Sequence, residues 1–293
     1  ANQGATLMLS LAKSEYVETL GMARSLLLSP SGTSLNSTLN EVLKTITNLP
    51  ETGQYVLIIY DAPETVEPLA YGLTLLTFDS TSFMTTDSGP LTPGVTKRAQ
   101  HEAGEVDTHF LQVTAGQSFT AVVRDTSDGS FSPRAILLDP SGTIVLDVLD
   151  PVGSVLVSNQ LPISGTYRLL VCGLDAGSYS LTAWLTAAAL PTTGDSSAIS
   201  SGEARLGNTL AGDLDVYTFN ATAGVPFDLR FRRLSIITNY TPRILMYSPT
   251  GALLQDVTWL NSHSLIFANP PAGNYTFVVL DGEADATGTY SIA

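Results

Sequence analysis

The sequence predicts an all-β protein of three tandem antiparallel β-sandwich domains, and two observations lead to this fold class. The first is a repeat in which a strand runs into a Pro-Ser/Thr-Gly turn, as LLLSPSGTSL (26–35), ILLDPSGTIV (136–145) and ILMYSPTGALL (244–254). The turn prolines lie at positions 30, 140 and 249, so the spacing is 110 and then 109 residues. A nearly constant period of this size indicates whole repeated domains rather than one large core.

The second observation is a chain of short strands separated by frequent turns. VDTHFLQV (106–113) and LDVYTFNA (214–221) alternate apolar and polar residues, which is typical of a strand buried on one face. Turn signals recur at intervals of about 8 to 12 residues, as in all-β sandwiches. The segment 35–50 resembles an amphipathic helix, but its counterpart in the second repeat carries Pro151 and Gly153, so we expect strands in both.

A Gly-x-Tyr element precedes an apolar strand in each repeat. Its tyrosines are Tyr55, Tyr167 and Tyr275. We expect each ring to point into the core and each hydroxyl to reach a backbone group at the corner.

The repeats divide the chain into an incomplete sandwich (1–79), a linker (80–94), a sandwich (95–186), a second linker (187–202) and a third sandwich (203–293). Both linkers are rich in Thr, Ser, Gly and Pro and lack an apolar period. Because each repeat is long enough for its own core, we expect a rod of domains that contact one another little.

The first repeat is short at its front. Its opening residues ANQGATLMLSLAK align with VTAGQSFTAVVRD of the second repeat, so the strand that comes before this segment is missing. The favoured explanation is that the chain was cut from a longer protein. The alternative is that another copy or another segment supplies the strand by β-augmentation and links subunits into a fibre.

Composition narrows the function classes. The formal net charge of −14 and the pI near 4.4 argue against nucleic acid and anionic membrane surfaces as partners. The single cysteine, Cys172, leaves no intrachain disulfide and sits in an apolar run, so we interpret it as a small buried hydrophobic residue. No run of 18 apolar residues predicts membrane insertion, and the first residues lack the basic start of a signal peptide. We therefore expect a mature or excised secreted or surface protein.

An ordered set of motifs extends over most of the chain. Gly-Asp-x-Asp-x-Tyr-x-Phe is followed by Thr-Ala-Gly, Pro-x-Gly, Leu-Pro-x-x-Gly-x-Tyr and Gly-x-Tyr-x-Leu. The third repeat matches most fully, through Gly212, Asp213, Asp215, Tyr217, Phe219, Ala223, Gly224, Pro249, Gly251, Gly273, Tyr275 and Tyr290. In the second repeat His109 replaces the aromatic residue and Glu105 the first Asp.

This order resembles the bacterial pre-peptidase C-terminal (PPC) domain. The resemblance implies a jelly-roll-like β-sandwich that serves as an accessory, adhesive or substrate-binding module of secreted proteins. The first repeat shows only the later motifs, SPSG, LPETGQY and AYGLTLL.

The chain shows few signs of catalysis. His101, His109 and His263 have no His or Cys three or four residues away, and the sequence contains neither Gly-x-Ser-x-Gly nor His-Glu-x-x-His. We therefore interpret the histidines as surface or half-buried polar residues and predict a non-enzymatic protein without a cofactor.

Paired carboxylates offer one alternative, a calcium site. Asp213 and Asp215, like Glu105 and Asp107, occupy alternate strand positions and so face the same side. Asp213, Asp215 and Asp107 are the candidate ligands. Two carboxylates are few for calcium, and Asp beside Gly often makes a turn, so the turn is the favoured interpretation.

Four Asn-x-Ser/Thr sequons are candidate glycosylation sites: Asn36, Asn220, Asn239 and Asn274. Asn274 and Asn239 have the clearest loop context.

Together these features predict a non-enzymatic extracellular or cell-surface structural or adhesive protein. Its expected partners are further copies of itself through strand addition, glycans or an extracellular-matrix protein. The alternative is a carbohydrate- or protein-binding accessory module of a secreted hydrolase or peptidase. An exposed Trp or Tyr on one face would mark that module. The candidates are Trp184 and Trp259, although Trp184 alternates like a core residue.

Overall fold

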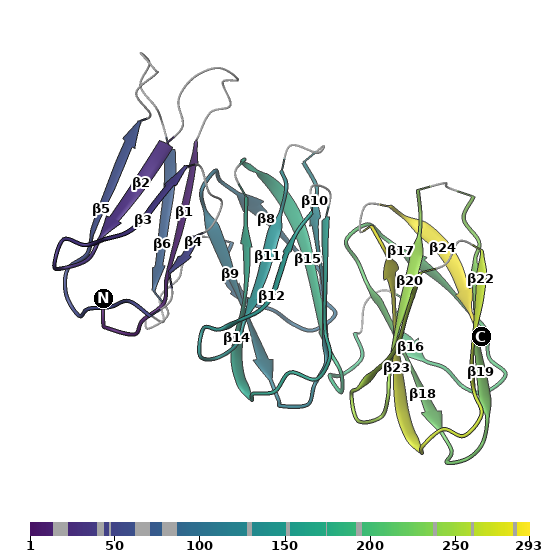
Figure 1. Cartoon of the computed structure of the whole chain (residues 1–293). Helices are drawn as coiled ribbons and strands as arrows, with labels where there is room; N and C mark the ends of the chain where they lie inside the picture. The colour runs from purple at the N-terminus through teal and green to yellow at the C-terminus, as the bar shows by residue number, and fades with distance from the viewer. Residues whose placement is uncertain are drawn as a thin grey trace.

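The computed structural model of the chain is all-β, which confirms the predicted fold class (Figure 1). It describes residues 1–13, 23–39, 44–46, 48–61, 71–77, 87–127, 131–150, 153–173, 175–191, 195–236, 239–258, 261–283 and 286–293; for residues 12, 13, 23, 36–39, 44–46 and 61 only the backbone is described. Six sheets form three successive pairs, here called the first, second and third sandwich. The division into separate domains at the predicted boundaries stays a prediction. No helix long and apolar enough to cross a membrane occurs among the described residues.

The first sandwich pairs two three-stranded sheets. Sheet 1a has the order β3-β2-β5 and sheet 1b the order β4-β1-β6. Their strands are β1 (Leu7–Lys13), β2 (Ala23–Leu28), β3 (Ser34–Leu39), β4 (Lys44–Ile46), β5 (Val56–Asp61) and β6 (Tyr71–Thr77). β4 and all of β3 except Ser34 lie within the segment 35–50, so the expectation of strands is confirmed for the described residues of this segment. Leu7, Leu27 and Leu49 form a small core between the sheets.

The second sandwich pairs a five-stranded sheet 2a (β12-β11-β14-β9-β7) with a four-stranded sheet 2b (β13-β10-β15-β8). Its strands are β7 (Gly89–Pro90), β8 (Lys97–His101), β9 (Val106–Val113), β10 (Phe119–Asp125), β11 (Arg134–Leu138), β12 (Ile144–Leu149), β13 (Gly153–Ser158), β14 (Gly165–Cys172) and β15 (Gly177–Leu185). Inward side chains such as Phe119, Tyr167 and Leu181 fill its core.

The third sandwich repeats this plan, with sheet 3a (β16-β18-β23-β20-β21) against sheet 3b (β17-β24-β19-β22). Its strands are β16 (Ser197–Ala198), β17 (Arg205–Thr209), β18 (Asp215–Ala221), β19 (Phe227–Arg233), β20 (Pro242–Tyr247), β21 (Leu253–Thr258), β22 (Ser262–Phe267), β23 (Gly273–Asp281) and β24 (Gly288–Ile292). Tyr217, Phe231 and Phe277 are central to its core.

The repeated turn and the Gly-x-Tyr element lie against each other in every sandwich. A Cβ added to Gly53 would lie 2.8 Å from Pro30, and one added to Gly165 would lie 2.8 Å from Pro140. Gly273 stands in the same relation to Pro249, at 2.7 Å. All three glycines have positive φ angles, which L side chains rarely adopt. Glycine is therefore required at this corner because the proline ring occupies the space that a side chain would need.

The tyrosines of these elements point inward as expected. Tyr167 and Tyr275 are buried, and Tyr55 packs on the small core of the first sandwich. The Tyr55 hydroxyl donates to the Glu51 carbonyl (2.6 Å) and that of Tyr275 to the Pro271 carbonyl (3.3 Å). At Tyr55 and Tyr275 the hydroxyl thus ties the strand to its own corner, four residues back.

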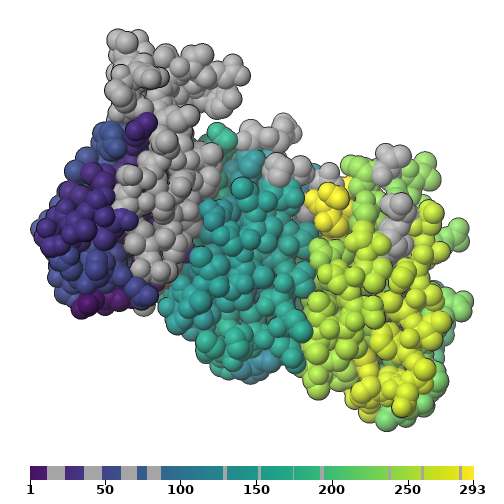
Figure 2. All heavy atoms as spheres, in the orientation of Figure 1, coloured from purple at the N-terminus to yellow at the C-terminus, as the bar shows by residue number. Residues whose placement is uncertain are grey.

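The three sandwiches pack tightly on one another, and the expectation that they contact one another little is wrong. Sheet 1b packs on sheet 2a through Met8 and Leu76, which meet residues including Ile136 and Leu170. Sheet 2b packs on sheet 3a through a second apolar cluster: Val122, Trp184, Leu214, Val216, Leu245, Tyr247, Val278 and Leu280. The result is a stack of sheets in which the atoms of the second and third sandwiches are in contact (Figure 2). Outward strand positions are apolar here because a neighbouring sheet covers them.

The predicted linkers also build sheet structure. β7 lies in the segment 80–94 and pairs in parallel with β9, and β16 lies in 187–202 and pairs in parallel with β18. The Ser88 hydroxyl accepts from the Thr108 amide (2.9 Å), and the Ser196 hydroxyl accepts from the Val216 amide (2.8 Å). These segments therefore add edge strands instead of acting as free spacers. Antiparallel sheets were predicted, but these two short strands pair in parallel.

Candidate functional site

The turn before β9, and its counterpart before β18, docks each later sandwich on the one before it. A Cβ added to Gly104 would lie 2.5 Å from the carbonyl oxygen of Gly72 in the first sandwich. The carbonyl of Gly212 accepts a hydrogen bond from the Thr182 hydroxyl of the second sandwich (2.9 Å). The glycine that opens the Gly-Asp-x-Asp motif thus permits close backbone contact between sandwiches.

The first sandwich differs from the other two at its edge. In the second sandwich β9 covers the edge of β14 and β8 covers β15; β18 and β17 do the same in the third. Among the described residues no strand occupies these positions in the first sandwich, so β5 and β6 are edge strands. Within the described part of the chain, both sheets therefore end on the same side with a strand that pairs with one neighbour.

Side chains that face inward on β6 are exposed as a result. β6 pairs with β1 as β15 pairs with β10, so Leu73 corresponds to Leu181 and Leu75 to Ala183. Leu73 and Leu75 are 42% and 51% exposed, whereas Leu181 and Ala183 are 0% and 1% exposed. We call Tyr71, Leu73 and Leu75 the open edge of the first sandwich.

The outward face of sheet 1a is apolar and uncovered as well. Val56, Ile58 and Tyr60 are 40 to 48% exposed. Ile58 occupies the strand position of Leu170 and Val278, which are buried between sandwiches. We call these three residues the outer apolar face.

The opposite end of the stack carries charged residues. Sheet 3b presents Asp228, Arg230, Arg232 and Ser264 outward, together with the exposed apolar side chains of Leu206 and Ile266. Arg230 Nε donates to Asp228 (2.7 Å), and Ser264 donates to the same carboxylate. The charged groups on this face distinguish it from the outer apolar face, so the two ends of this molecule are chemically different.

Each complete sandwich buries a carboxylate that is bonded to a tyrosine. The Tyr179 hydroxyl donates to Asp107 (2.9 Å) and lies 2.8 Å from His109 Nε2. In the third sandwich the Tyr290 hydroxyl donates to Asp215 (2.8 Å) and lies 2.8 Å from the Tyr217 hydroxyl.

His109 in the second sandwich occupies the hydrogen-bonding position that Tyr217 has in the third. Since the single Tyr179 proton goes to Asp107, His109 Nε2 donates to the Tyr179 oxygen, as the Tyr217 hydroxyl donates to Tyr290. The exchange of His for the aromatic residue in the second repeat preserves a hydrogen-bond donor at this point of the core.

Burial displaces the pKa values of these groups. Burial raises the pKa of Asp215 to about 7, and the charges of Asp213 and Asp195 act in the same direction. Burial, assisted by Lys97, lowers the pKa of His109 to about 4, so this ring is neutral near pH 7. The pKa values of Tyr179 and Tyr290 are raised, first by burial and then by the adjacent carboxylates. These networks are structural arrangements of neutral donors around a buried carboxyl group.

The structure corrects the interpretation of two histidines. His101 and His109 are 2% and 0% exposed rather than superficial, while His263 is half buried on β22. His101 also lies with Glu105 and Asp107 in a group whose ligand atoms are all within 4.8 Å of one another. The sequence analysis missed this group because it sought His or Cys at fixed spacing, whereas a tight turn between the two sheets brings the end of β8 close to the start of β9.

The predicted calcium ligands lie at the sandwich junctions. Asp213 accepts from the Leu214 amide (2.8 Å), which supports its interpretation as a turn residue, and burial raises its pKa. Asp215 and Asp107 each receive a tyrosine hydrogen bond. Calcium at Asp213, Asp215 and Asp107 stays a prediction.

Cys172 and Trp184 are both buried between sandwiches. Cys172 is fully buried beside Leu170, and burial raises the pKa of its thiol to about 12, so the prediction of an unreactive buried residue fits. Trp184 is 1% exposed, so its ring is not available on the surface to contact a ligand. Trp259 lies outside the described residues.

Three of the four sequon asparagines have described side chains. Asn220, Asn239 and Asn274 are exposed, and Asn220 and Asn274 face each other across β18 and β23. Asn36 lies on β3, where only the backbone is described. Glycosylation at these four positions stays a prediction.

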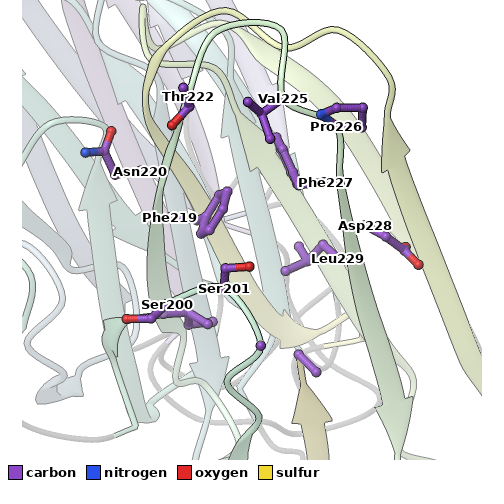
Figure 3. Close-up of a pocket in the computed structure, with 13 residues that line it drawn as sticks. Ser200, Ser201, Phe219, Asn220, Thr222, Val225, Pro226, Phe227, Asp228 and Leu229 are labelled. Atoms are coloured by element: carbon purple, nitrogen blue, oxygen red, sulfur yellow. The ribbon is translucent and has the colours of Figure 1, made fainter.

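A pocket of about 580 Å³ opens at one end of the third sandwich (Figure 3). Phe219, Phe227 and Leu229 supply its apolar side, and Ser200 and Asn220 stand at its polar margin. Such a combination of apolar wall and polar rim suits a small ligand.

No family model and no curated protein matches this chain. Among solved structures it is similar to the pre-peptidase C-terminal domain of collagenase from Bacillus anthracis, with 19% identity, 35% of this chain and 97% of that chain covered, and a TM-score of 0.30. It is also similar to the PBSX exported protein XepA (11% identity, 68% of this chain and 88% of that one, TM-score 0.26). A third similar structure is the infectious bursal disease virus VP2 subviral particle (12% identity, 100% and 67%, TM-score 0.21). Membership of the PPC family stays a prediction.

Proposed function

We propose that this chain is a non-enzymatic structural or adhesive protein that acts outside the cell and joins a neighbouring chain by strand addition at the open edge of its first sandwich. The observation that carries the proposal is the exposure of Leu73 and Leu75 at positions that are buried in the second sandwich. A strand laid along β6 or β5 would cover them as β8 and β9 cover the corresponding residues there.

The energetics favour such an addition. An edge strand carries unpaired amide and carbonyl groups that another strand can satisfy. Covering the half-exposed side chains of Tyr71, Leu73 and Leu75 adds roughly 1 kcal/mol each, given about 1.5–3 kcal/mol for a fully buried large side chain. Backbone pairing and apolar burial therefore act together at this edge.

Composition supports the extracellular and structural part of the proposal. Charged residues make up 14% of the chain, and it has one cysteine, which is buried. The buried His109 and Tyr179 serve the core, where they bond each other. A stack of sheets whose two ends differ in polarity can also assemble with a defined direction.

Sedimentation velocity and electron microscopy of the full chain test the proposal. We expect concentration-dependent assembly. The double variant Leu73→Lys/Leu75→Lys should abolish it, because lysine on an edge strand opposes pairing.

A matched control is Leu206→Lys, which places the same charge on the edge strand β17 of the complete third sandwich, at a side chain that is 76% exposed. This variant should assemble like the wild type. A wild-type chain that stays monomeric at every concentration, or assembly that survives the double substitution, would refute strand addition at this edge.

The pocket in the third sandwich supports a second candidate function, a carbohydrate- or protein-binding accessory module. Its aromatic wall includes Phe219, whose ring points into the space in Figure 3. A glycan array would test it: Phe219→Ala should lose any glycan bound by the wild type, and Ile266→Ala, outside the pocket, should retain it. Absence of any glycan signal from the wild type would count against a carbohydrate ligand.

A further inference from the structure

The tight turn that joins β8 of sheet 2b to β9 of sheet 2a gathers one imidazole and two carboxylates at the junction of the first and second sandwiches. His101 ends β8, Glu105 lies in the connecting turn, and Asp107 follows on β9. Their ligand atoms lie within 4.8 Å of one another, and in the described part of the chain this is the single such group of three.

The orientation of His101 directs its second ring nitrogen, Nδ1, toward the carboxylate of Asp107. Its side chain is fully buried, and its Nε2 lies 3.3 Å from the carbonyl oxygen of Gly173. Because a carbonyl can only accept, Nε2 carries a proton, and Nδ1 is left as a lone pair in the neutral ring. Nδ1 has no hydrogen-bond partner and lies 3.8 Å from Asp107 Oδ2. Two electron-rich atoms thus face each other at a distance too long for a hydrogen bond.

This arrangement is the one found around metal-bound histidine. Such a ring commonly donates its other N–H to a backbone carbonyl, which fixes its orientation. The Phe131 ring packs on His101 with centroids 4.7 Å apart and restrains it further. Asp107 is held in turn by the Tyr179 hydroxyl (2.9 Å), so its carboxylate is also fixed in place.

Glu105 completes the group and supplies access. It is half buried, and it accepts from the Glu102 amide (2.8 Å). Ligand bonds of about 2.0–2.2 Å place ligand atoms up to about 4 Å apart, so a small rotation of this flexible side chain closes the set.

We propose that His101, Glu105 and Asp107 bind a divalent transition-metal ion of the zinc type. An imidazole nitrogen with two carboxylate oxygens suits zinc and its neighbours, with water at the fourth position. Calcium takes six to eight oxygen ligands, so this nitrogen-containing set disfavours it. The ion would fix the turn around Gly104, which contacts Gly72 of the first sandwich.

The third sandwich provides an internal control. At the corresponding positions it has Thr209, Asp213 and Asp215, so the carboxylates remain but the imidazole is absent. The Thr209 hydroxyl instead lies 3.1 Å from that of Tyr240. The third sandwich should therefore not bind zinc.

Calorimetric titration of the chelator-treated full chain with Zn²⁺ tests the site, and Co²⁺ absorption reports its geometry. We expect one tight site per chain and a Zn²⁺-dependent rise in Tm. His101→Thr, which introduces the residue of the third sandwich, should weaken Zn²⁺ binding at least about a hundredfold and remove the rise in Tm. His263→Thr is the matched control and should bind like the wild type.

The His101→Thr variant could lose Zn²⁺ binding simply because it misfolds, so Glu105→Gln is a second test of the site. The Glu105 side chain is only half buried, so this substitution should leave the fold intact and still weaken Zn²⁺ binding. Three results would overturn the proposal: no Zn²⁺ binding by the wild type below millimolar concentration, unchanged binding by His101→Thr, or Ca²⁺ binding as tight as Zn²⁺ binding.

Discussion

The first and second sandwiches share the structure of their Gly–Pro corner but differ in the burial of the side chains on their edge strands. Gly53 packs on Pro30 as Gly165 packs on Pro140, so the corner is built alike in both. Leu73, in contrast, is 42% exposed where Leu181 is fully buried. The difference teaches that the repeated motifs specify local corners, while closure of the core depends on strands that come from elsewhere in the sequence.

The strongest test of this difference is the removal of one leucine from each sandwich. Leu181→Ala should cost about 2–5 kcal/mol of unfolding free energy, because it leaves a cavity in a closed core. Leu73→Ala should cost less than about 1 kcal/mol, because its side chain already meets solvent. Urea denaturation of both variants measures this, and equal costs would mean that the first sandwich is closed in solution.

The buried carboxylate gives the complete sandwiches a pH dependence. Burial raises the pKa of Asp215 from 3.8 to about 7 in the folded chain. The folded state then keeps a proton that the unfolded state releases, so stability falls as the pH rises from about 4 to 7 and stays low above 7. Asp215→Asn should abolish this fall, which amounts to about 2–4 kcal/mol. Thermal denaturation between pH 4 and pH 8 measures it, and an unchanged pH profile in the variant would assign the fall to other groups.

The shared corner should respond alike in both sandwiches. Gly165→Ala and Gly53→Ala each place a Cβ about 3 Å or less from a proline at a positive φ angle, so each should cost about 1–3 kcal/mol. Thermal denaturation compares the two variants. A neutral Gly53→Ala variant would show that the first sandwich lacks the corner that its motif specifies.

The smallest expected effect on stability comes from substitutions on the outward faces of the sheets. Val278→Ala, between the second and third sandwiches, should cost about 1–2 kcal/mol, whereas Ile58→Ala at the same strand position of the outer apolar face should leave the stability of the isolated chain unchanged. Chemical denaturation measures both. A cost for Ile58→Ala that falls with dilution would instead reveal that another molecule covers this face.

Much of the fold could be predicted from particular residues. The turn prolines at 30, 140 and 249 predicted the period. The alternation along 106–113 correctly predicted a strand, although β9 is buried on both faces and not on one as expected. The Gly-x-Tyr elements predicted that their tyrosines point inward, and for Tyr55 and Tyr275 also that the hydroxyl bonds a backbone group at the corner. These features succeeded because turns and strand faces depend on neighbours close in the sequence.

Contacts between sandwiches could not be predicted in the same way. Val122 and Trp184 look like core residues in the sequence, yet they contact the next sandwich. A period-2 pattern distinguishes two faces of a strand without saying which sheet covers each face. The group of His101, Glu105 and Asp107 was not predicted for a related reason, since a turn between two sheets joins residues whose spacing matches no metal motif.

By itself the sequence determined that the chain is all-β, that it repeats about every 110 residues, and that each repeat turns at a Pro-Gly corner, because these properties follow from local backbone preferences. Only the tertiary structure decided which apolar faces are shared between sandwiches and which are left open, and where the imidazole of His101 meets two carboxylates. Burial and metal-binding geometry depend on what lies opposite a side chain in space, and that is fixed when the sheets pack.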